Sequence, residues 1–163
     1  MAKVTVLGGC GAVGSVAVKT LAISGVFSEV VIADANLERA RTMAKELGPG
    51  VTAVACDVLD PPSLRQALRG SDVVLNCVGP FYTTVKPILA AVMEAGVNYV
   101  DVCDDVDVTL DLLDMDEAVQ RAGIAVLLGM GSSPGMTNVI ARFAADALLD
   151  TTDSVDIFHT HGG

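Results

Sequence analysis

The sequence predicts an α/β fold, a doubly wound parallel sheet with helices on both of its faces. Short apolar runs alternate with longer segments of helical character along almost the whole chain. The short runs are continuously apolar, which is typical of strands buried on both sides. Repeated strand–helix–strand units wind right-handed into one parallel sheet. With 4% aromatic residues and no Trp, the core must be built mainly from Val, Ala, Leu and Ile.

The expected strands are these short apolar runs, and the repeat predicts that they lie side by side in the order 3-2-1-4-5. A further strand should extend the sheet, and a last one should begin near the end of the chain. The expected strands cover residues 3–8, 29–34, 51–56, 72–78, 98–103, 124–129 and 153–161.

Glycine, proline and N-cap residues set the bounds of the expected helices. Asn36 is a favourable N-cap, and Gly25, Gly48 and Gly96 each follow the end of a helical segment. Pro87 directly follows Lys86, so a helix is expected to begin there. The expected helices cover residues 12–24, 36–47, 61–70, 86–96, 107–123 and 134–149.

Charge and composition exclude several classes of protein. A formal net charge of −10 argues against nucleic acid, whose binding needs Lys and Arg, and against an anionic membrane surface. Mean hydropathy is +0.56, yet no apolar run approaches the roughly 18 residues of a membrane span. The chain enters its first strand at once, which leaves no room for a signal peptide. The 4 Cys lack a close-spaced pairing pattern, so free thiols and a cytoplasmic location are expected.

The stretch VTVLGGCGAVG, residues 4–14, predicts a dinucleotide site of the Rossmann type. Gly9, Gly11 and Gly14 spell G-x-G-x-x-G, while Gly8, Gly11 and Gly14 give the spacing associated with short-chain reductases. Gly9 is expected to make the turn, Gly11 to let the backbone approach the pyrophosphate, and Gly14 to let helix and strand pack closely. The expected pyrophosphate contacts are Gly9, Cys10, Gly11, Ala12, Val13 and Gly14.

Asp34 is the acidic partner of this turn. It ends the second strand about 20 residues after the last glycine, where a carboxylate accepts hydrogen bonds from the adenosine ribose. The same carboxylate would repel the 2′-phosphate of NADP, so NAD is the expected cofactor and NADP the less favoured one. Arg39 and Arg41 lie on the following helix and could swing in toward a 2′-phosphate.

Two further loops at the same edge of the sheet should line the cofactor. Asp57 and Val58 follow the third strand, where Asp57 meets the adenine edge or, alternatively, caps the next helix. The segment NCVGPFY, residues 76–82, follows the fourth strand. Its backbone at Val78 and Gly79 should line the path to the nicotinamide. The expected contacts from this segment are Cys77, Val78, Gly79 and Pro80.

Tyr82 and Lys86 match the Y-x-x-x-K pair of short-chain reductases, in which the tyrosine donates a proton and the lysine lowers its pKa. In that family the pair follows strand five, whereas here it follows strand four. A helix that begins at Pro87 would also not carry both residues. We therefore do not expect the pair to act together, although Tyr82 remains a candidate catalytic residue beside the nicotinamide.

With these motifs, the segments YVDVCDD and GMGSSPGMTNVIAR make the chain resemble the saccharopine dehydrogenase family, and within it the lysine 6-dehydrogenase branch. The resemblance implies hydride transfer between nicotinamide and a substrate carbon that bears nitrogen. It also implies a Rossmann domain at residues 1–152, with residues 153–163 as the truncated start of a substrate domain. The family's domain is often labelled NADP-binding, and Asp34 departs from that label.

The resemblance implies a cationic amine in the substrate, and Asp101 is the candidate to meet it. Asp101 ends the fifth strand at the carboxyl edge of the sheet, and its alternative is a helix cap or a loop acid. The loop GSSPG, residues 131–135, should close over the nicotinamide end of the site. Ser132 or Ser133 could instead cap the helix that Pro134 opens.

No metal site is expected. Cys56 and Cys103 follow strands three and five, which are four spacings or about 19 Å apart, too far for one ion. The acids around Asp105 and Asp107 lack EF-hand spacing and are typical of a first helical turn. His159 and His161 share a face of the last expected strand without a third ligand.

The sequence therefore predicts an NAD-dependent amino-acid dehydrogenase, represented by its nucleotide-binding part. A non-catalytic dinucleotide-binding regulatory module and an atypical short-chain-type reductase are the alternatives. The expected partners are an amino-acid substrate and, from the apolar composition, a second copy of the chain in a homodimer.

Overall fold

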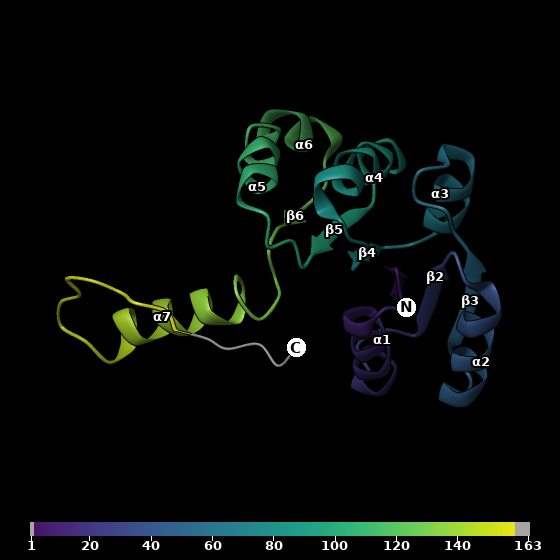
Figure 1. Ribbon diagram of the computed structural model, residues 1–163, viewed down its shortest axis with the longest axis horizontal. Helices are drawn as coiled ribbons and strands as arrows, with labels where there is room; N and C mark the ends of the chain where they lie inside the picture. Colours follow the sequence, from purple (N-terminus) through teal and green to yellow (C-terminus); the bar gives the residue numbers. More distant parts are fainter. Residues whose placement is uncertain (1, 159–163) are drawn as a thin grey trace.

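A computed structural model describes residues 2–158, and its centre is a parallel sheet in the order β3-β2-β1-β4-β5-β6 (Figure 1). This is the predicted order, because each crossover places the next strand on the expected side. β2 has the expected bounds, whereas the other five strands are shorter than expected and β6 has only two residues. They are Lys3–Leu7 (β1), Glu29–Asp34 (β2), Val51–Ala55 (β3), Val73–Asn76 (β4), Asn98–Asp101 (β5) and Val126–Leu127 (β6).

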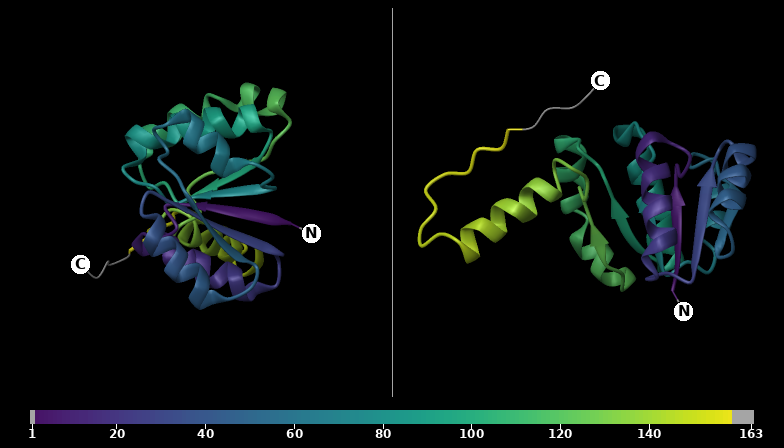
Figure 2. Two further views of the ribbon diagram at one scale, coloured as in Figure 1. Left: turned by 90° about the vertical axis from the view of Figure 1, so that its right-hand side faces the viewer. Right: turned by 90° about the horizontal axis from the view of Figure 1, so that it is seen from below.

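Helices cover both faces of the sheet, as a doubly wound fold requires. Figure 2 shows α1 and α2 below the sheet and α3 to α6 above it, while α7 projects away from the body. The helices are Ala12–Ser24 (α1), Leu37–Leu47 (α2), Pro61–Leu68 (α3), Phe81–Ala95 (α4), Val106–Leu113 (α5), Asp116–Ala122 (α6) and Met136–Ala147 (α7).

Alternating side chains of the strands divide the core into one cluster on each face. Val6 and Ile32 are fully buried on the face covered by α1 and α2. Leu7, Val74 and Tyr99 are buried on the other face, against α3 and α4. Because each strand must place its buried side chains in these two clusters, the register between neighbouring strands is fixed. The register in turn determines where each strand ends. The loops that follow the strands therefore meet at one carboxyl edge.

Helix α4 begins five residues earlier than the sequence predicted. It starts at Phe81 and runs through Tyr82, Lys86 and Pro87 without a break. Pro87 costs the helix one backbone hydrogen bond, because proline has no N–H to donate to the carbonyl of Thr83. Burial of one face of α4 offsets that cost. The fully buried residues of that face are Val85, Ile88, Leu89 and Val92.

Two further expectations for the second half of the chain were wrong. The single helix expected at 107–123 is broken into α5 and α6 at Asp114 and Met115, and Met115 packs against the core at the break. No strand forms over residues 153–158, and the rest of the strand expected at 153–161 lies outside the described residues.

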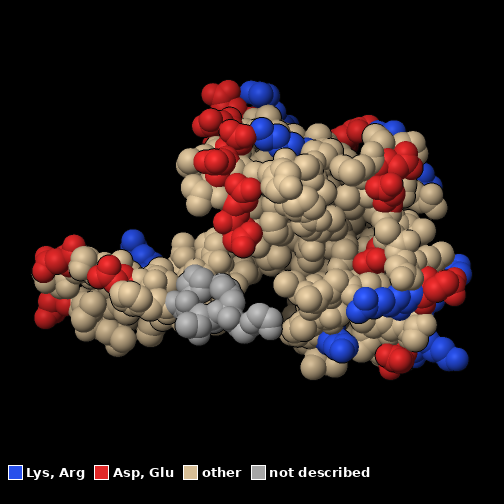
Figure 3. All heavy atoms as spheres, viewed as in Figure 1, with Lys and Arg blue, Asp and Glu red and all other residues tan. Residues whose placement is uncertain are grey.

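The surface is acidic over one region and apolar over another. Figure 3 shows acidic side chains gathered over α5 and α6. Asp105 caps α5 by accepting from the amide of Val108, and Asp107 lies in the first turn, as expected. Helix α7 has no buried residue, and Phe143 on it is 61% exposed. Among the described residues no helix is both long and apolar enough to cross a membrane.

The continuous course of α4 through Pro87 predicts the effect of a substitution. Pro87 is exposed, so Pro87→Ala should leave the packing unchanged while adding an N–H that reaches Thr83 and a better helix former. We expect the free energy of unfolding to rise by about 1 kcal/mol, measured by urea denaturation. An unchanged or lower stability would mean that α4 does not run straight through residue 87 in solution.

Candidate functional site

The glycine turn between β1 and α1 is held together by contacts that only glycine permits. The left-handed backbone of the turn falls on Gly8, with φ +70°, and not on Gly9 as expected. A Cβ at Gly9 would lie 2.9 Å from Ile32 Cγ2, and one at Gly14 would overlap the carbonyl oxygen of Gly8. The glycines of both motifs therefore have structural roles, because Gly8 makes the turn while Gly9 and Gly14 allow close packing.

The turn leaves backbone donors exposed at the start of α1. Gly11 is the N-cap, its own N–H donates to Gly8 O at 2.9 Å, and no side chain caps the helix. The first N–H groups of a helix have no partner within it, and they carry a partial positive charge. Gly11, Ala12 and Val13 are exposed, so the free amides of Ala12 and Val13 are accessible to an anion such as a pyrophosphate.

Asp34 connects this turn to the loop after β2 through hydrogen bonds of its side chain. Its Oδ2 accepts from the amide of Cys10 at 2.8 Å, and its Oδ1 accepts from the amide of Asn36 at 2.9 Å. The carboxylate is therefore held at the edge of the sheet beside the turn, where the sequence predicted it. Each oxygen keeps a lone pair that a ribose hydroxyl can use.

Two adjoining hollows open at this edge. One, of about 340 Å³, contains the glycine turn, and the other, of about 350 Å³, lies between the loops after β3 and β4. Asp34, Gly8, Val78 and Gly79 line both hollows. The first is also lined by Cys10, Gly11, Asn36, Arg39 and Cys77. The second is also lined by Ala35, Cys56, Asp57, Val58, Leu59, Pro80, Thr83 and Thr84.

The residues after β3 and β4 reach these hollows with their backbones fixed. Asp57 Oδ1 accepts from the amide of Leu59 at 2.9 Å, and Asp60 rather than Asp57 caps α3. Asn76 Oδ1 accepts from the amide of Val78 at 2.9 Å, while Thr84 Oγ1 donates to Val78 O at 2.9 Å. Asn76 and Thr84 were not predicted, although an Asn inside an apolar strand was a signal that could have found the first.

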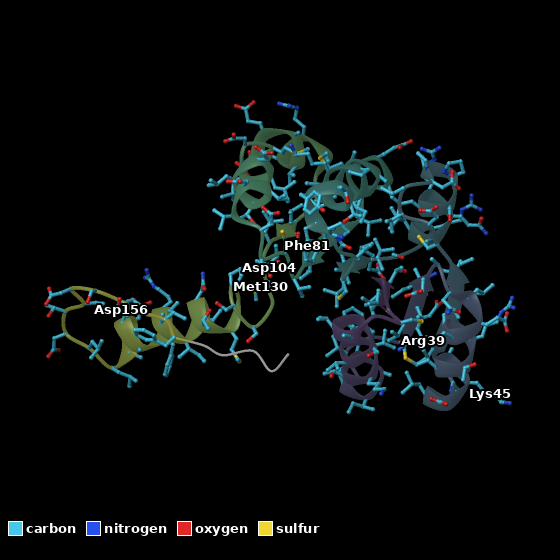
Figure 4. The ribbon with its side chains drawn as sticks, viewed as in Figure 1. Arg39, Lys45, Phe81, Asp104, Met130 and Asp156 are labelled. Carbon is cyan, nitrogen blue, oxygen red and sulfur yellow. The ribbon has the colours of Figure 1, made fainter. Side chains whose placement is uncertain are left out.

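Arg39 is the basic residue that lines the first hollow together with Asp34. Figure 4 shows Arg39 on the side of α2 that faces α1, whereas Lys45 points outward. Arg41, the other arginine considered, pairs with Glu38 at 2.8 Å and lines a separate hollow beside β3. Within residues 2–158, Arg39 forms no ion pair.

The two candidate catalytic residues lie in very different surroundings. Tyr82 is 70% exposed on the first turn of α4, and Lys86 is bound at 2.6 Å by Asp111 of α5. Asp101 is fully buried, and its Oδ1 accepts from the amides of Cys103 and Gly129. Lys86 is therefore paired with Asp111 and not with Tyr82, and the side chain of Asp101 is not accessible to solvent.

The cysteines of the described part of the chain form no metal site, and the loop after β6 provides no side-chain cap for α7. Burial raises the pKa of Cys56 and of Cys77 to about 11, so both thiols stay protonated at neutral pH. Within the described part of the chain, no group of three His, Cys, Asp or Glu residues could hold a metal ion. His159 and His161 lie outside it. Gly135 is the N-cap of α7 without a side-chain cap, so the cap expected from Ser132 or Ser133 is wrong.

Known proteins resemble the chain over this same region. A family model described as the saccharopine dehydrogenase NADP binding domain matches residues 4–127. The carboxyaminopropylagmatine dehydrogenase of Synechocystis is 30% identical over all of this chain and 42% of its own length. The trans-acting enoyl reductase of Mycobacterium tuberculosis is 28% identical over 83% of this chain and 34% of its own length. The chain thus spans less than half of these relatives.

A solved structure agrees with these sequence relatives. The apo saccharopine dehydrogenase (L-Glu forming) of Saccharomyces cerevisiae superposes with a TM-score of 0.76 at 25% identity. The match covers 90% of this chain and 31% of that one.

The contact between Gly14 and Gly8 yields a direct test of the turn. Gly14→Ala places a methyl group against the Gly8 carbonyl, so we expect the free energy of unfolding to fall by about 1–3 kcal/mol. Denaturant unfolding measures the change. Gly79→Ala is the matched control, because a Cβ there meets no atom within 4 Å. Equal stabilities of the two variants would contradict the packing described for the turn.

Proposed function

The chain belongs to the saccharopine dehydrogenase family, and on that premise we propose that it is the nicotinamide-binding part of an oxidoreductase. The substrate that we propose is an amino acid or amino-acid conjugate whose C–N bond is oxidised or reduced through an imine. The observation that carries the proposal is the meeting of the glycine turn, Asp34, Asp57 and the segment 78–80 around two adjoining hollows. Dinucleotides bind at this edge of doubly wound sheets.

Each part of the proposed cofactor has residues that suit it. The free amides of Ala12 and Val13 would hold the pyrophosphate, Gly11 would let it approach the backbone, and Asp34 would hold the adenosine ribose. The second hollow, of about 350 Å³ and lined by both apolar residues and Asp57, would hold the adenine ring. The backbone at Val78 and Gly79 then leads toward the nicotinamide end. When bound, the nicotinamide supplies the hydride chemistry, while the protein supplies position and a dry cleft.

We propose NAD as the preferred cofactor. Asp34 cannot rotate away from a bound ribose without losing hydrogen bonds to Cys10 and Asn36. A 2′-phosphate would bring negative charge against that fixed carboxylate. Arg39 is the residue that could reverse the preference, because it lines the same hollow and has its charge free within residues 2–158. The family model's description names NADP, so the two cofactors must be compared directly.

Titrations with NADH and NADPH, followed by the fluorescence of the bound nicotinamide, measure this preference. We expect NADH to bind at least about tenfold more tightly, since one unscreened carboxylate–phosphate contact costs on the order of 1.4 kcal/mol. Asp34→Ser should narrow the difference. Tighter binding of NADPH by the unmodified protein, lost in Arg39→Ala, would overturn the NAD preference and assign the 2′-phosphate to Arg39.

The proposed C–N chemistry needs a substrate amine to lose a proton as hydride leaves its carbon. Tyr82 is exposed at the start of α4 beside the segment 78–80, and we propose that it lines that end of the site without taking the proton. Its partner in a short-chain reductase would be Lys86, which is bound by Asp111 instead. This ion pair favours the amino-acid dehydrogenase over the short-chain reductase.

A substrate panel tests the reaction. Full-length protein should reduce NAD with at least one amino acid or amino-acid conjugate, lysine and saccharopine being assayed first. Tyr82→Phe should keep activity within about tenfold, because it is not part of a Tyr–Lys pair. A loss of all activity in Tyr82→Phe with cofactor binding intact would instead support the short-chain alternative. Cofactor binding without turnover on any amine would support a binding module, or an enoyl reductase like the mycobacterial relative.

A further inference from the structure

Three buried polar side chains stand at the carboxyl ends of β4 and β5, within an otherwise apolar cluster. Asn76 and Asp101 are completely buried, and Tyr99 is 1% exposed. Asn76 lies directly opposite Asp101 in the register of the two strands, and Tyr99 is two residues earlier on β5. The three side chains therefore share the face of the sheet that α4 covers. Buried polar groups are costly unless they are hydrogen-bonded, and all three side chains take part in hydrogen bonds.

Asp101 joins the loop after β5 to the loop after β6. Its Oδ1 accepts from the amide of Cys103 at 3.1 Å and from the amide of Gly129 at 2.7 Å. Its backbone carbonyl accepts from the amide of Met130 at 2.8 Å. Met130 is labelled in Figure 4 at this edge of the sheet. One residue therefore holds two successive amides at the point where the segment 129–135 begins.

The segment 129–135 is itself compact, so fixing its start fixes the whole segment. Gly129 and Gly135 have positive φ angles, and a bridge joins Gly131 to Gly135. The amide of Met136 donates to Gly131 O at 2.9 Å. A Cβ on Gly129 would lie 3.0 Å from Pro134 Cγ and 3.3 Å from the carbonyl oxygen of Cys103.

Tyr99 and Asn76 extend the same network to the loop after β4. Asn76 Nδ2 donates to the Tyr99 hydroxyl at 3.0 Å, and Asn76 Oδ1 accepts from the amide of Val78. Burial, and then the neighbouring Asp101 carboxylate, raise the pKa of Tyr99, so its hydroxyl keeps its proton. In residues 2–158, Asp101 Oδ2 is the buried side-chain oxygen left without a hydrogen-bond partner. The free hydroxyl hydrogen of Tyr99 is the donor that can rotate toward it.

We infer that Asp101 is a positioning residue that fixes the segment 129–135 at the nicotinamide end of the site, with Tyr99 and Asn76 joining it to the loop after β4. This inference rests on the proposed function for the identity of that end. Asp101 does not touch a substrate, because its side chain has no exposed surface. Its carboxylate acts through the amides of Cys103 and Gly129, which it holds at one relative position.

The test compares three variants of the full-length protein. Asp101→Leu has a similar volume but no acceptor. Asp101→Asn keeps one carbonyl oxygen for the two amides, and its amide nitrogen can donate to Tyr99. Thr5→Val is the matched control, because Thr5 is also a completely buried polar residue of the sheet but bonds to Ser71, far from these loops. Amide hydrogen exchange and NADH fluorescence are measured for each.

In Asp101→Leu we expect exchange in the segment 128–131 to become at least about tenfold faster, with exchange in β1 and β2 unchanged. The emission enhancement of bound NADH should fall, while its affinity stays within about threefold, since the adenosine half binds elsewhere. Asp101→Asn should restore both readouts to near the original values. Thr5→Val should change neither, even if it lowers the melting temperature.

Unchanged exchange in Asp101→Leu, or an Asp101→Asn variant as defective as the leucine variant, would overturn the positioning role. Should Asp101→Leu fail to fold, Tyr99→Phe decides, because it removes the remaining donor while keeping the ring. Faster exchange near both Val78 and Gly129 would support the network, and no change at either would overturn it. Failure of the unmodified protein to bind NADH would refute the proposed function alone, because the exchange measurements do not depend on the cofactor.

Discussion

The close contact between Gly14 of α1 and the carbonyl of Gly8 determines how the rest of the site is arranged. Because Gly14 has no side chain, the first turn of α1 lies directly against the end of β1. That approach aims the free amides of the helix at the carboxyl edge of the sheet. The two hollows open beside them. Most of the residues expected to bind a dinucleotide line those hollows, but Gly9, Ala12, Val13 and Gly14 do not. A side chain at Gly14 would separate helix and strand, and one at Gly8 would meet Val78 and the backbone of Cys77.

A second constraint repeats along the same edge. At or just after the ends of β2, β3, β4 and β5 stands an Asp or Asn whose side-chain oxygen accepts from the amide two residues later. These residues are Asp34, Asp57, Asn76 and Asp101. Such turns fix the direction in which each loop leaves its strand. Asp34 and Asp101 also accept an amide from a neighbouring loop, so the edge is a connected framework rather than a set of independent loops.

The sequence was informative where local pattern and packing agree, and misleading where tertiary contacts override local preference. Continuous apolar runs and the glycine spacing predicted the strand order and the place of Asp34 because the backbone itself imposes them. The start of α4 was missed because burial of Val85 and Ile88 outweighs the cost of Pro87. The burial of Asp101 could not be predicted either, because its partner Gly129 comes from another loop and only the folded sheet brings the two together.

The central claim is that a nicotinamide dinucleotide lies along the carboxyl edge with its pyrophosphate on the glycine turn. Backbone amide chemical shifts, recorded during an NADH titration of isotope-labelled protein, test it most directly. The account predicts the largest shifts at Gly11, Ala12 and Val13, with smaller ones near Asp34 and Val78. Another hollow of about 380 Å³, lined by Arg65, Arg69 and Gly96, lies at the opposite edge of the sheet. Shifts confined to that hollow, with none at the glycine turn, would contradict the account.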